Sequence, residues 1–119
     1  AKMFSDSLSD SDKKIFDIPE FQYLFMRDFQ ILFKHGAKGP SFDAQKNYKE
    51  WEFDIADVEF PVQIYHGAED KFVPISQSEY IVKKLKNAEL TVIEKQGHFY
   101  HVAYGYRLLQ KVSQKYYAG

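Results

Sequence analysis

Residues 61–98 read PVQIYHGAEDKFVPISQSEYIVKKLKNAELTVIEKQGH and decide the fold that we expect for this chain. Residues 61–67 are mostly apolar or β-branched and are bounded by a proline and a glycine, which is typical of a strand. Residues 75–86 carry apolar side chains at helical spacing, and residues 90–93 read as a second strand. A strand–helix–strand unit of this length predicts two parallel strands joined by a right-handed crossover.

An ionisable side chain follows each of the two predicted strands. Asp70 comes shortly after the first strand, and His98 lies in the loop after the second. Because the carboxyl ends of parallel neighbours lie at one edge of a sheet, these two side chains are expected to meet. A carboxylate beside an imidazole holds the ring through Nδ1–H and stabilises the imidazolium that forms during proton transfer. The pair is therefore predicted to be a catalytic acid and base.

Each of these residues also has a simpler interpretation. Asp70 alone would suit the turn before Val73-Pro74, because aspartate favours turns, and His98 alone would suit a surface loop. Glu69 is expected to be solvated. His66, at the end of the first strand, is expected to be packed and hydrogen-bonded rather than to be a ligand.

Helices are expected on both sides of this unit. Downstream, residues 104–117 form a last helix whose inward residues are Leu108, Leu109, Val112 and Tyr116. Upstream, a polar stretch rich in helix-capping residues precedes a short helix over residues 12–16. A longer helix follows and ends at Gly36, and residues 36–50 are expected to be loop with room for one helical turn. The fold class is α/β, with helices followed by strand–helix–strand–helix.

The longer upstream helix has an aromatic and aliphatic stripe. Its apolar residues at helical spacing are Phe21, Leu24, Phe25, Phe29, Leu32 and Phe33. Large aromatic rings are the usual material of cores and interfaces, so core filling is the favoured interpretation. The alternative is that one side of the stripe lines an apolar acyl site.

Composition excludes several classes of function. The formal net charge of -1 does not favour a nucleic-acid or anionic-membrane partner. The absence of cysteine excludes disulfides, a thiolate nucleophile and cysteine-ligated metals. No signal peptide or membrane-spanning run is visible, so a cytoplasmic location is expected. The opening Ala1-Lys2-Met3 suggests a chain cut from something longer.

The order of these features resembles the C-terminal quarter of the α/β-hydrolase superfamily. The resemblance is carried by Gly67-x-x-Asp70-x-x-Val73-Pro74 after one strand and Gly97-His98 after the next. Upstream, residues 51–58 are similar to the segment that leads from the cap back to the core sheet. The aromatic helix, Gly36 and Asp43 are similar to cap-region elements of bacterial esterase- and aminopeptidase-like members. The resemblance implies a helical cap remnant over residues 1–50 and the C-terminal part of the core sheet over residues 51–119.

The same resemblance implies a serine hydrolase in which the triad runs in the order Ser, Asp, His along the chain. Asp70 would then be the triad acid and His98 the base, and no cofactor would be needed. The family's Gly-x-Ser-x-Gly turn is absent from this sequence, and Gly39-Pro40-Ser41-Phe42-Asp43 follows no strand and lacks the second glycine. The nucleophile is therefore expected upstream of Ala1, and this chain alone is expected to be inactive.

Two other classes of function stay open. A relative that lost its nucleophile would be a non-catalytic interaction module. A metal- or phosphate-handling enzyme would need a Gly-rich loop or a carboxylate cluster, and neither is present in the sequence. His98 and His101, with His66 or Asp70 as a third ligand, are a weak candidate for a metal site.

A small acyl substrate, such as an ester or amide, is the partner expected of the parent protein. Further copies of itself are the partner expected of this chain. Nucleic acid and membrane are not expected as partners. Two strands do not make a stable sheet, so the free edge of residues 61–66 is expected to pair with another copy. The cap helices, with the aromatic stretch 21–33 foremost, are the other predicted surface for a homo-oligomer.

Overall fold

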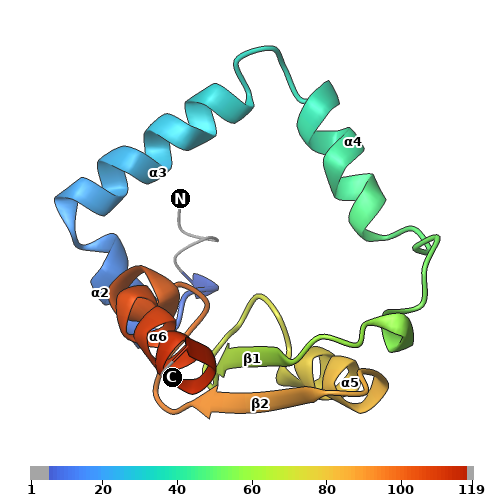
Figure 1. Cartoon of the computed structure of the whole chain (residues 1–119). Coiled ribbons are helices and arrows are strands. Elements are labelled where there is room, and N and C mark those ends of the chain that lie inside the picture. The colour runs from blue at the N-terminus through green and yellow to red at the C-terminus, as the bar shows by residue number, and fades with distance from the viewer. Residues whose placement is uncertain (1–5, 118–119) are drawn as a thin grey trace. The chain divides into compact units, whose positions relative to one another are not determined.

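The computed structural model describes residues 6–117 and has the expected α/β composition (Figure 1). Its order of elements is helices first and then strand–helix–strand–helix, which confirms the predicted fold class. The elements are α2 (Asp10–Phe16), α3 (Pro19–Leu32), α4 (Lys38–Asn47), the short 3-10 helix η1 (Ile55–Asp57), β1 (Val62–Gly67), α5 (Ile75–Lys84), β2 (Ala88–Ile93) and α6 (Tyr100–Tyr117).

The described residues form two compact units. One contains residues 6–15 and 55–117 and holds both strands, whereas the other contains residues 16–54. The expected division into residues 1–50 and residues 51–119 stays a prediction. Residues 6–15 belong to the same unit as the two strands.

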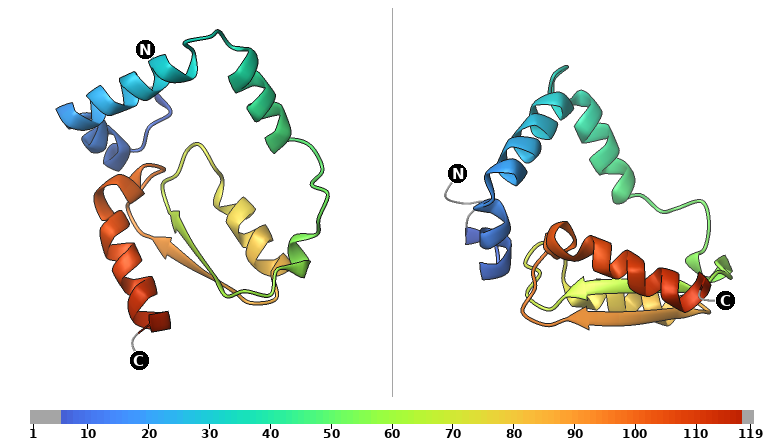
Figure 2. Two further views of the ribbon diagram at one scale, coloured as in Figure 1. Left: turned by 45° about the horizontal axis from the view of Figure 1, so that its top comes forward. Right: turned by 60° about the vertical axis from the view of Figure 1, so that its left-hand side comes forward.

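The strands β1 and β2 are parallel, as predicted, and pair in register from Val62 opposite Ala88 to Gly67 opposite Ile93. The helix α5 crosses between them and packs against both strands (Figure 2). The amide of Ala68 still donates to the carbonyl of Ile93 at 3.0 Å, so the ladder extends into the first loop. Both loops that follow the strands therefore leave from the same edge of the sheet.

The last helix is tied to the sheet near each of its ends. The phenol of Tyr100 donates to the carbonyl of Tyr65 on β1 at 2.9 Å, and the Lys115 ammonium pairs with the Glu89 carboxylate on β2 at 2.6 Å. Leu108 and Val112 are partly buried as expected. The expectation for Leu109 is wrong, because its side chain is 70% exposed. The side chain of Tyr116 lies outside the described residues.

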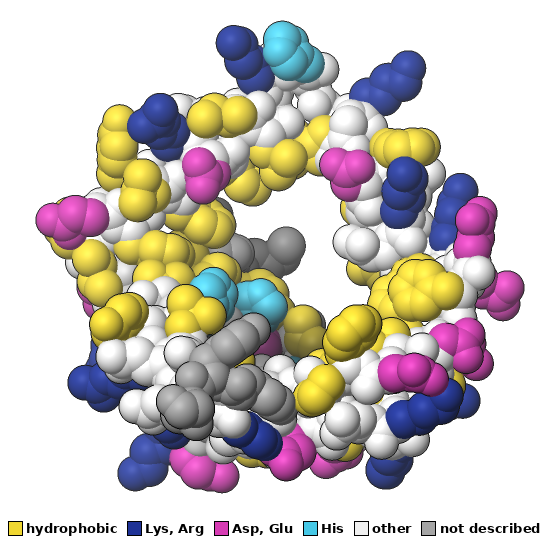
Figure 3. Space-filling model, viewed as in Figure 1, with side chains coloured by type: hydrophobic (Ala, Val, Ile, Leu, Met, Phe, Trp, Pro, Cys, Tyr) yellow, Lys and Arg dark blue, Asp and Glu magenta, His cyan; other side chains and the backbone are white. Residues whose placement is uncertain are grey.

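The second unit carries the aromatic stripe along α3. Phe21, Phe25, Phe29 and Phe33 form a ladder of rings whose neighbouring centroids lie 4.7–6.4 Å apart. Such pairs four residues apart stabilise a helix from its own side chains. None of the residues of α3 is buried, however, so the stripe does not fill a core within the described residues (Figure 3). Gly36 ends this region with a positive φ of 84°, as its position predicted.

The segment expected to be loop contains a helix, α4, which corrects the prediction for residues 36–50. Phe42 is the one large apolar residue in α4, so no apolar periodicity indicates the helix. Pro40 lies in the first turn, where its missing N–H has no partner to lose.

Candidate functional site

The carboxylate of Asp70 and the imidazole of His98 meet at the edge where the two strands end. Oδ2 of Asp70 lies 2.9 Å from Nδ1 of His98. Asp70 comes from the loop after β1 and His98 from the loop after β2. The proximity expected from parallel pairing is therefore present, although 28 residues of chain separate the two side chains.

The loop after β1 holds the Asp70 side chain in one orientation. Its Oδ1 atom accepts from the backbone N–H groups of Phe72 at 2.8 Å and Val73 at 2.9 Å. The Asp70 amide donates to the Gly67 carbonyl at 3.1 Å, which closes the turn. The turn-forming role and the contact with His98 thus use different oxygens of one carboxylate. With Oδ1 occupied by the backbone, Oδ2 is directed at the imidazole.

Electrostatics favour the ionised form of Asp70. The side chain is only 7% exposed, and burial by itself raises the pKa of this carboxyl. Hydrogen bonds from the Val73 amide, the His98 ring and the Phe72 amide outweigh that effect and hold the pKa below its ordinary value of 3.8. A carboxylate only accepts hydrogen bonds, so Nδ1 of His98 must carry the hydrogen. In the neutral ring, Nε2 is then the basic nitrogen.

The imidazole of His98 is partly open to solvent. Its side chain is 37% exposed, and its ring lies 5.2 Å from the Phe72 ring and 5.1 Å from the Phe99 ring between centroids. Among the described residues no hydrogen-bond partner is recorded for Nε2. A ring held at Nδ1 and open at Nε2 can take a proton from a group that approaches from outside this chain segment.

The lowered pKa of Asp70 predicts a pH-dependent contribution to stability. Since its folded-state pKa is below the unfolded value, the contribution is present above the unfolded value and is lost as the pH falls through the folded value. We expect the difference in the free energy of unfolding between wild type and Asp70→Asn to shrink as the pH falls from about 5 through the folded-state pKa, which lies below 3.8. Urea denaturation at a series of pH values measures it. A difference that does not change with pH would contradict the assignment, because other acidic groups are common to both proteins and cancel.

The backbone of the His98 loop is held by residues that the sequence analysis did not single out. The Gly97 amide donates to Oγ of Ser11 at 2.8 Å. The amides of His98 and Phe99 donate to the two carboxylate oxygens of Asp12 at 3.1 and 2.8 Å. The Asp12 side chain is fully buried. These bonds join the N-terminal described residues to the loop that follows β2.

Two glycines allow the site loops to approach one another. A Cβ on Gly67 would collide with the carbonyl oxygens of Gln96 and Gly97. A Cβ on Gly97 would collide with the Asp12 carboxylate and the Ser9 hydroxyl. Glycine is therefore needed at these two positions because the neighbouring groups approach its backbone closely, and not because its torsion angles are unusual.

His66 is packed and hydrogen-bonded, as expected. It is 6% exposed, and its Nδ1 accepts from the Ser78 hydroxyl at 2.7 Å while Nε2 donates to the Val73 carbonyl at 3.0 Å. Because the Ser78 hydroxyl donates to one ring nitrogen and the Val73 carbonyl accepts from the other, both nitrogens of His66 are hydrogen-bonded within the protein. His66 thereby ties the end of β1 to α5 and to the loop that carries Asp70.

The remaining candidates lie outside this arrangement. Glu69 is exposed, as expected, and Ser41 lies inside α4 rather than at a strand-to-helix turn. His101 is exposed, and no group of three potential ligands able to hold a metal ion is found among residues 6–117.

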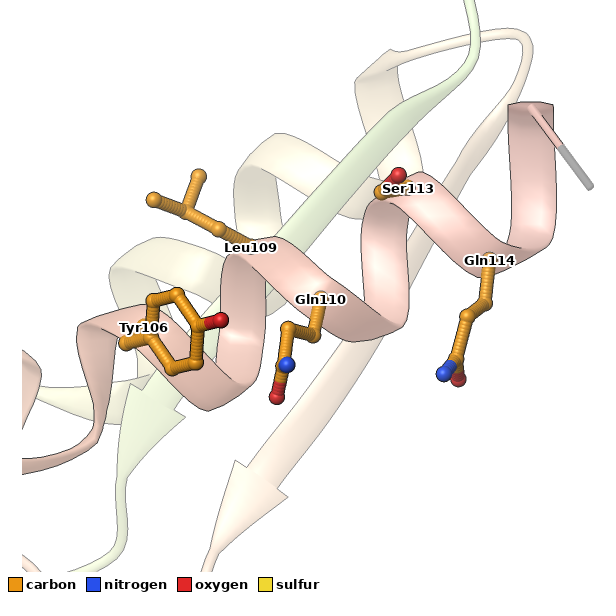
Figure 4. A pocket seen from close by; sticks show the side chains of 5 residues that line it. All are labelled: Tyr106, Leu109, Gln110, Ser113 and Gln114. Atoms are coloured by element: carbon orange, nitrogen blue, oxygen red, sulfur yellow. The ribbon is translucent and has the colours of Figure 1, made fainter.

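A hollow on α6 is lined by Tyr106, Leu109, Gln110, Ser113 and Gln114, and these five residues include no carboxylate or imidazole that would activate Ser113 (Figure 4). None of the helices in the described part of the chain is both long enough and apolar enough to cross a membrane.

Comparison with known proteins gives a partial match. No family model matches the chain, and no solved structure matches it. The chain is similar to a curated protein, the pimeloyl-[acyl-carrier protein] methyl ester esterase of Aromatoleum aromaticum, with 35% identity over 49 residues. The match covers 41% of this chain and 20% of the esterase, so it spans about a fifth of that relative's length.

Proposed function

We propose that this chain supplies the acid and the base of a serine hydrolase that acts on an ester or amide. The observation that carries the proposal is the 2.9 Å contact between Asp70 Oδ2 and His98 Nδ1, which leaves Nε2 as the basic nitrogen. The partial similarity to an esterase supports the same reaction class.

In the proposed reaction His98 moves one proton in each half. Its Nε2 takes the proton from a serine hydroxyl as the serine oxygen attacks the acyl carbon, and it then gives that proton to the departing alcohol or amine. In the second half it takes a proton from water, whose oxygen attacks the acyl-enzyme, and returns the proton to the serine oxygen. Asp70 stays ionised and stabilises the imidazolium in both halves.

The serine itself is proposed to come from outside residues 1–119. The sequence has no Gly-x-Ser-x-Gly string, and this turn is what places a serine at the exposed end of a strand. Ser41 is the nearest approximation, but it belongs to the first turn of α4. The proposal therefore concerns a whole protein of which these residues are a part, with a small acyl compound as substrate and without a cofactor.

The test compares the full-length protein with the isolated chain. We expect the full-length protein to hydrolyse an activated ester and a methyl ester of a medium-length acid, with a burst equal to one product per active site. The isolated chain should not exceed the rate of its own His98→Ala variant, because a lone imidazole in water is a poor catalyst and nothing is present to be acylated. Burst kinetics from the isolated chain, or a full-length protein inert toward esters and amides, would contradict the proposal.

Association between copies stays a prediction. Among the described residues β1 pairs with β2 and with no further strand, and α3 buries none of its residues. Either surface suits the homo-oligomer that the sequence predicts.

A further inference from the structure

We infer that Asp12 is a positioning residue that holds His98 in its working orientation, an inference that rests on the proposed function. Asp12 lies 86 residues before His98 in the chain and contacts its backbone rather than its ring. Its role would be to fix the main chain from which the imidazole projects, in the way that Asp70 fixes the ring itself.

The geometry around Asp12 is that of a fully satisfied buried carboxylate. Oδ2 accepts from the Ser9 hydroxyl at 2.8 Å, from the Ser9 amide at 3.3 Å and from the His98 amide at 3.1 Å. Oδ1 accepts from the Phe99 amide at 2.8 Å. No ion pair to Asp12 is found in the described part of the chain. Hydrogen bonds from N–H and O–H groups therefore replace the water that burial removes.

This carboxylate lies at the start of two helices at once. Ser9 and Asp12 form a capping box for α2, because the Asp12 amide donates to Ser9 Oγ at 3.1 Å while the carboxylate accepts from the Ser9 amide. The amides of His98 and Phe99 directly precede α6, which begins at Tyr100. A negative charge is favoured at the N-terminal end of a helix, so both helices stabilise the same group. The capping box thus joins the first described helix to the His98 loop.

The loop that carries Asp70 is tied to the same segment. The ammonium group of Lys71 donates to the Leu8 carbonyl at 3.0 Å, and the Gly97 amide donates to Ser11 Oγ. Residues 8–12 therefore contact both catalytic loops, one through Lys71 and the other through Ser11 and Asp12. The segment sets the spacing of the two loops as well as the orientation of His98.

The consequence for catalysis follows from the sensitivity of proton transfer to geometry. A displacement of about 1 Å in a catalytic group can cost roughly 100-fold in rate. Without the Asp12 carboxylate the amides of His98 and Phe99 lose their acceptor, and the loop is free to move toward water. The ring would keep its bond to Asp70 in only part of the population.

The test uses Asp12→Asn and Asp12→Ala in the full-length protein, with Asp10→Asn as the matched control. Asp10 is in the same helical turn, but its carboxylate is 89% exposed and pairs with Lys13 at 3.1 Å. We expect kcat to fall about 10-fold for Asp12→Asn, whose amide keeps one acceptor oxygen, and about 100-fold for Asp12→Ala. KM should change less than about 3-fold and Asp10→Asn should match wild type.

Rates are divided by the number of active sites that a fluorophosphonate titrates, so that unfolded protein does not contribute. The proton resonance of the His98 Nδ1–H, present in wild type, should broaden or shift in Asp12→Asn and not in Asp10→Asn. If Asp12→Ala does not fold, Ser11→Ala removes the acceptor of the Gly97 amide, together with the 2.9 Å hydrogen bond between the Ser9 and Ser11 hydroxyls, and should lower kcat several-fold. The inference would be overturned if Asp12→Asn had the kcat of wild type per titrated site and an unchanged His98 Nδ1–H resonance while His98→Ala was inactive. Full activity in His98→Ala would instead overturn the proposed function.

Discussion

His98→Ala in the full-length protein is expected to lower kcat on an ester by about 10⁴-fold or more, and Asp70→Asn by about 10³-fold to 10⁴-fold. Without the imidazole no group takes the proton from the serine hydroxyl. In Asp70→Asn the amide can donate to Nδ1, so the hydrogen moves to Nε2 and the ring can no longer accept there. Steady-state kinetics on one ester measures both losses of kcat, with each rate divided by the concentration of folded protein.

Two matched controls separate this effect from general damage. His101→Ala removes an exposed imidazole three residues from His98, and Glu69→Gln removes an exposed carboxylate beside Asp70. Both are expected to keep kcat within about 2-fold of wild type, because surface changes away from the reacting groups have small effects. If kcat fell as far in the two controls as in His98→Ala and Asp70→Asn, the assignment of His98 as base and Asp70 as acid would be contradicted.

Gly97→Ala is expected to have the largest effect on stability, a loss of about 2–4 kcal/mol in the free energy of unfolding. The added methyl group collides with the buried Asp12 carboxylate and with Ser9 Oγ, and these two groups are hydrogen-bonded to each other at 2.8 Å. Relief of the collision must break the bonds that Asp12 makes to the His98 loop. Activity should therefore fall together with stability. Urea denaturation and ester hydrolysis on the same preparation measure the two losses.

The matched control is Gly105→Ala. Gly105 lies inside α6, and a Cβ there meets no other atom within 4 Å. Alanine is the better helix former by about 1 kcal/mol, so this variant should be as stable as wild type or slightly more stable. A Gly97→Ala protein with the stability of the Gly105→Ala protein would show that the loop is not packed against Asp12 as described.

The unit of β1, α5 and β2 could be predicted because the sequence patterns that indicate it are local. A proline and a glycine bound β1, apolar spacing marks α5, and a parallel pair brings the ends of both strands to one edge. The contact between Asp70 and His98 follows from that topology and needs no side-chain detail. The packing of His66 was also predictable, since a polar ring at the end of a largely apolar strand needs partners.

Other features depend on contacts that no local pattern reveals. The spacing of Ser9 and Asp12 is a readable capping box, but nothing in it indicates that the carboxylate also binds the amides of His98 and Phe99. Leu109 fits the apolar spacing of α6 and yet lies on the exposed side, because two strands cover only part of the helix. The helix α4 has no apolar face, so its sequence carried none of the periodicity by which helices are found.

The rate at which a fluorophosphonate labels the full-length protein tests the central claim most directly. Labelling uses the serine and its activation by the base and the acid, and the fluoride that leaves phosphorus needs no proton from His98. The account predicts one labelled serine per molecule, found by peptide mapping outside residues 1–119, and a labelling rate that falls by about 10³-fold or more in His98→Ala. Labelling at the wild-type rate in His98→Ala, or a labelled serine within residues 1–119, would contradict it.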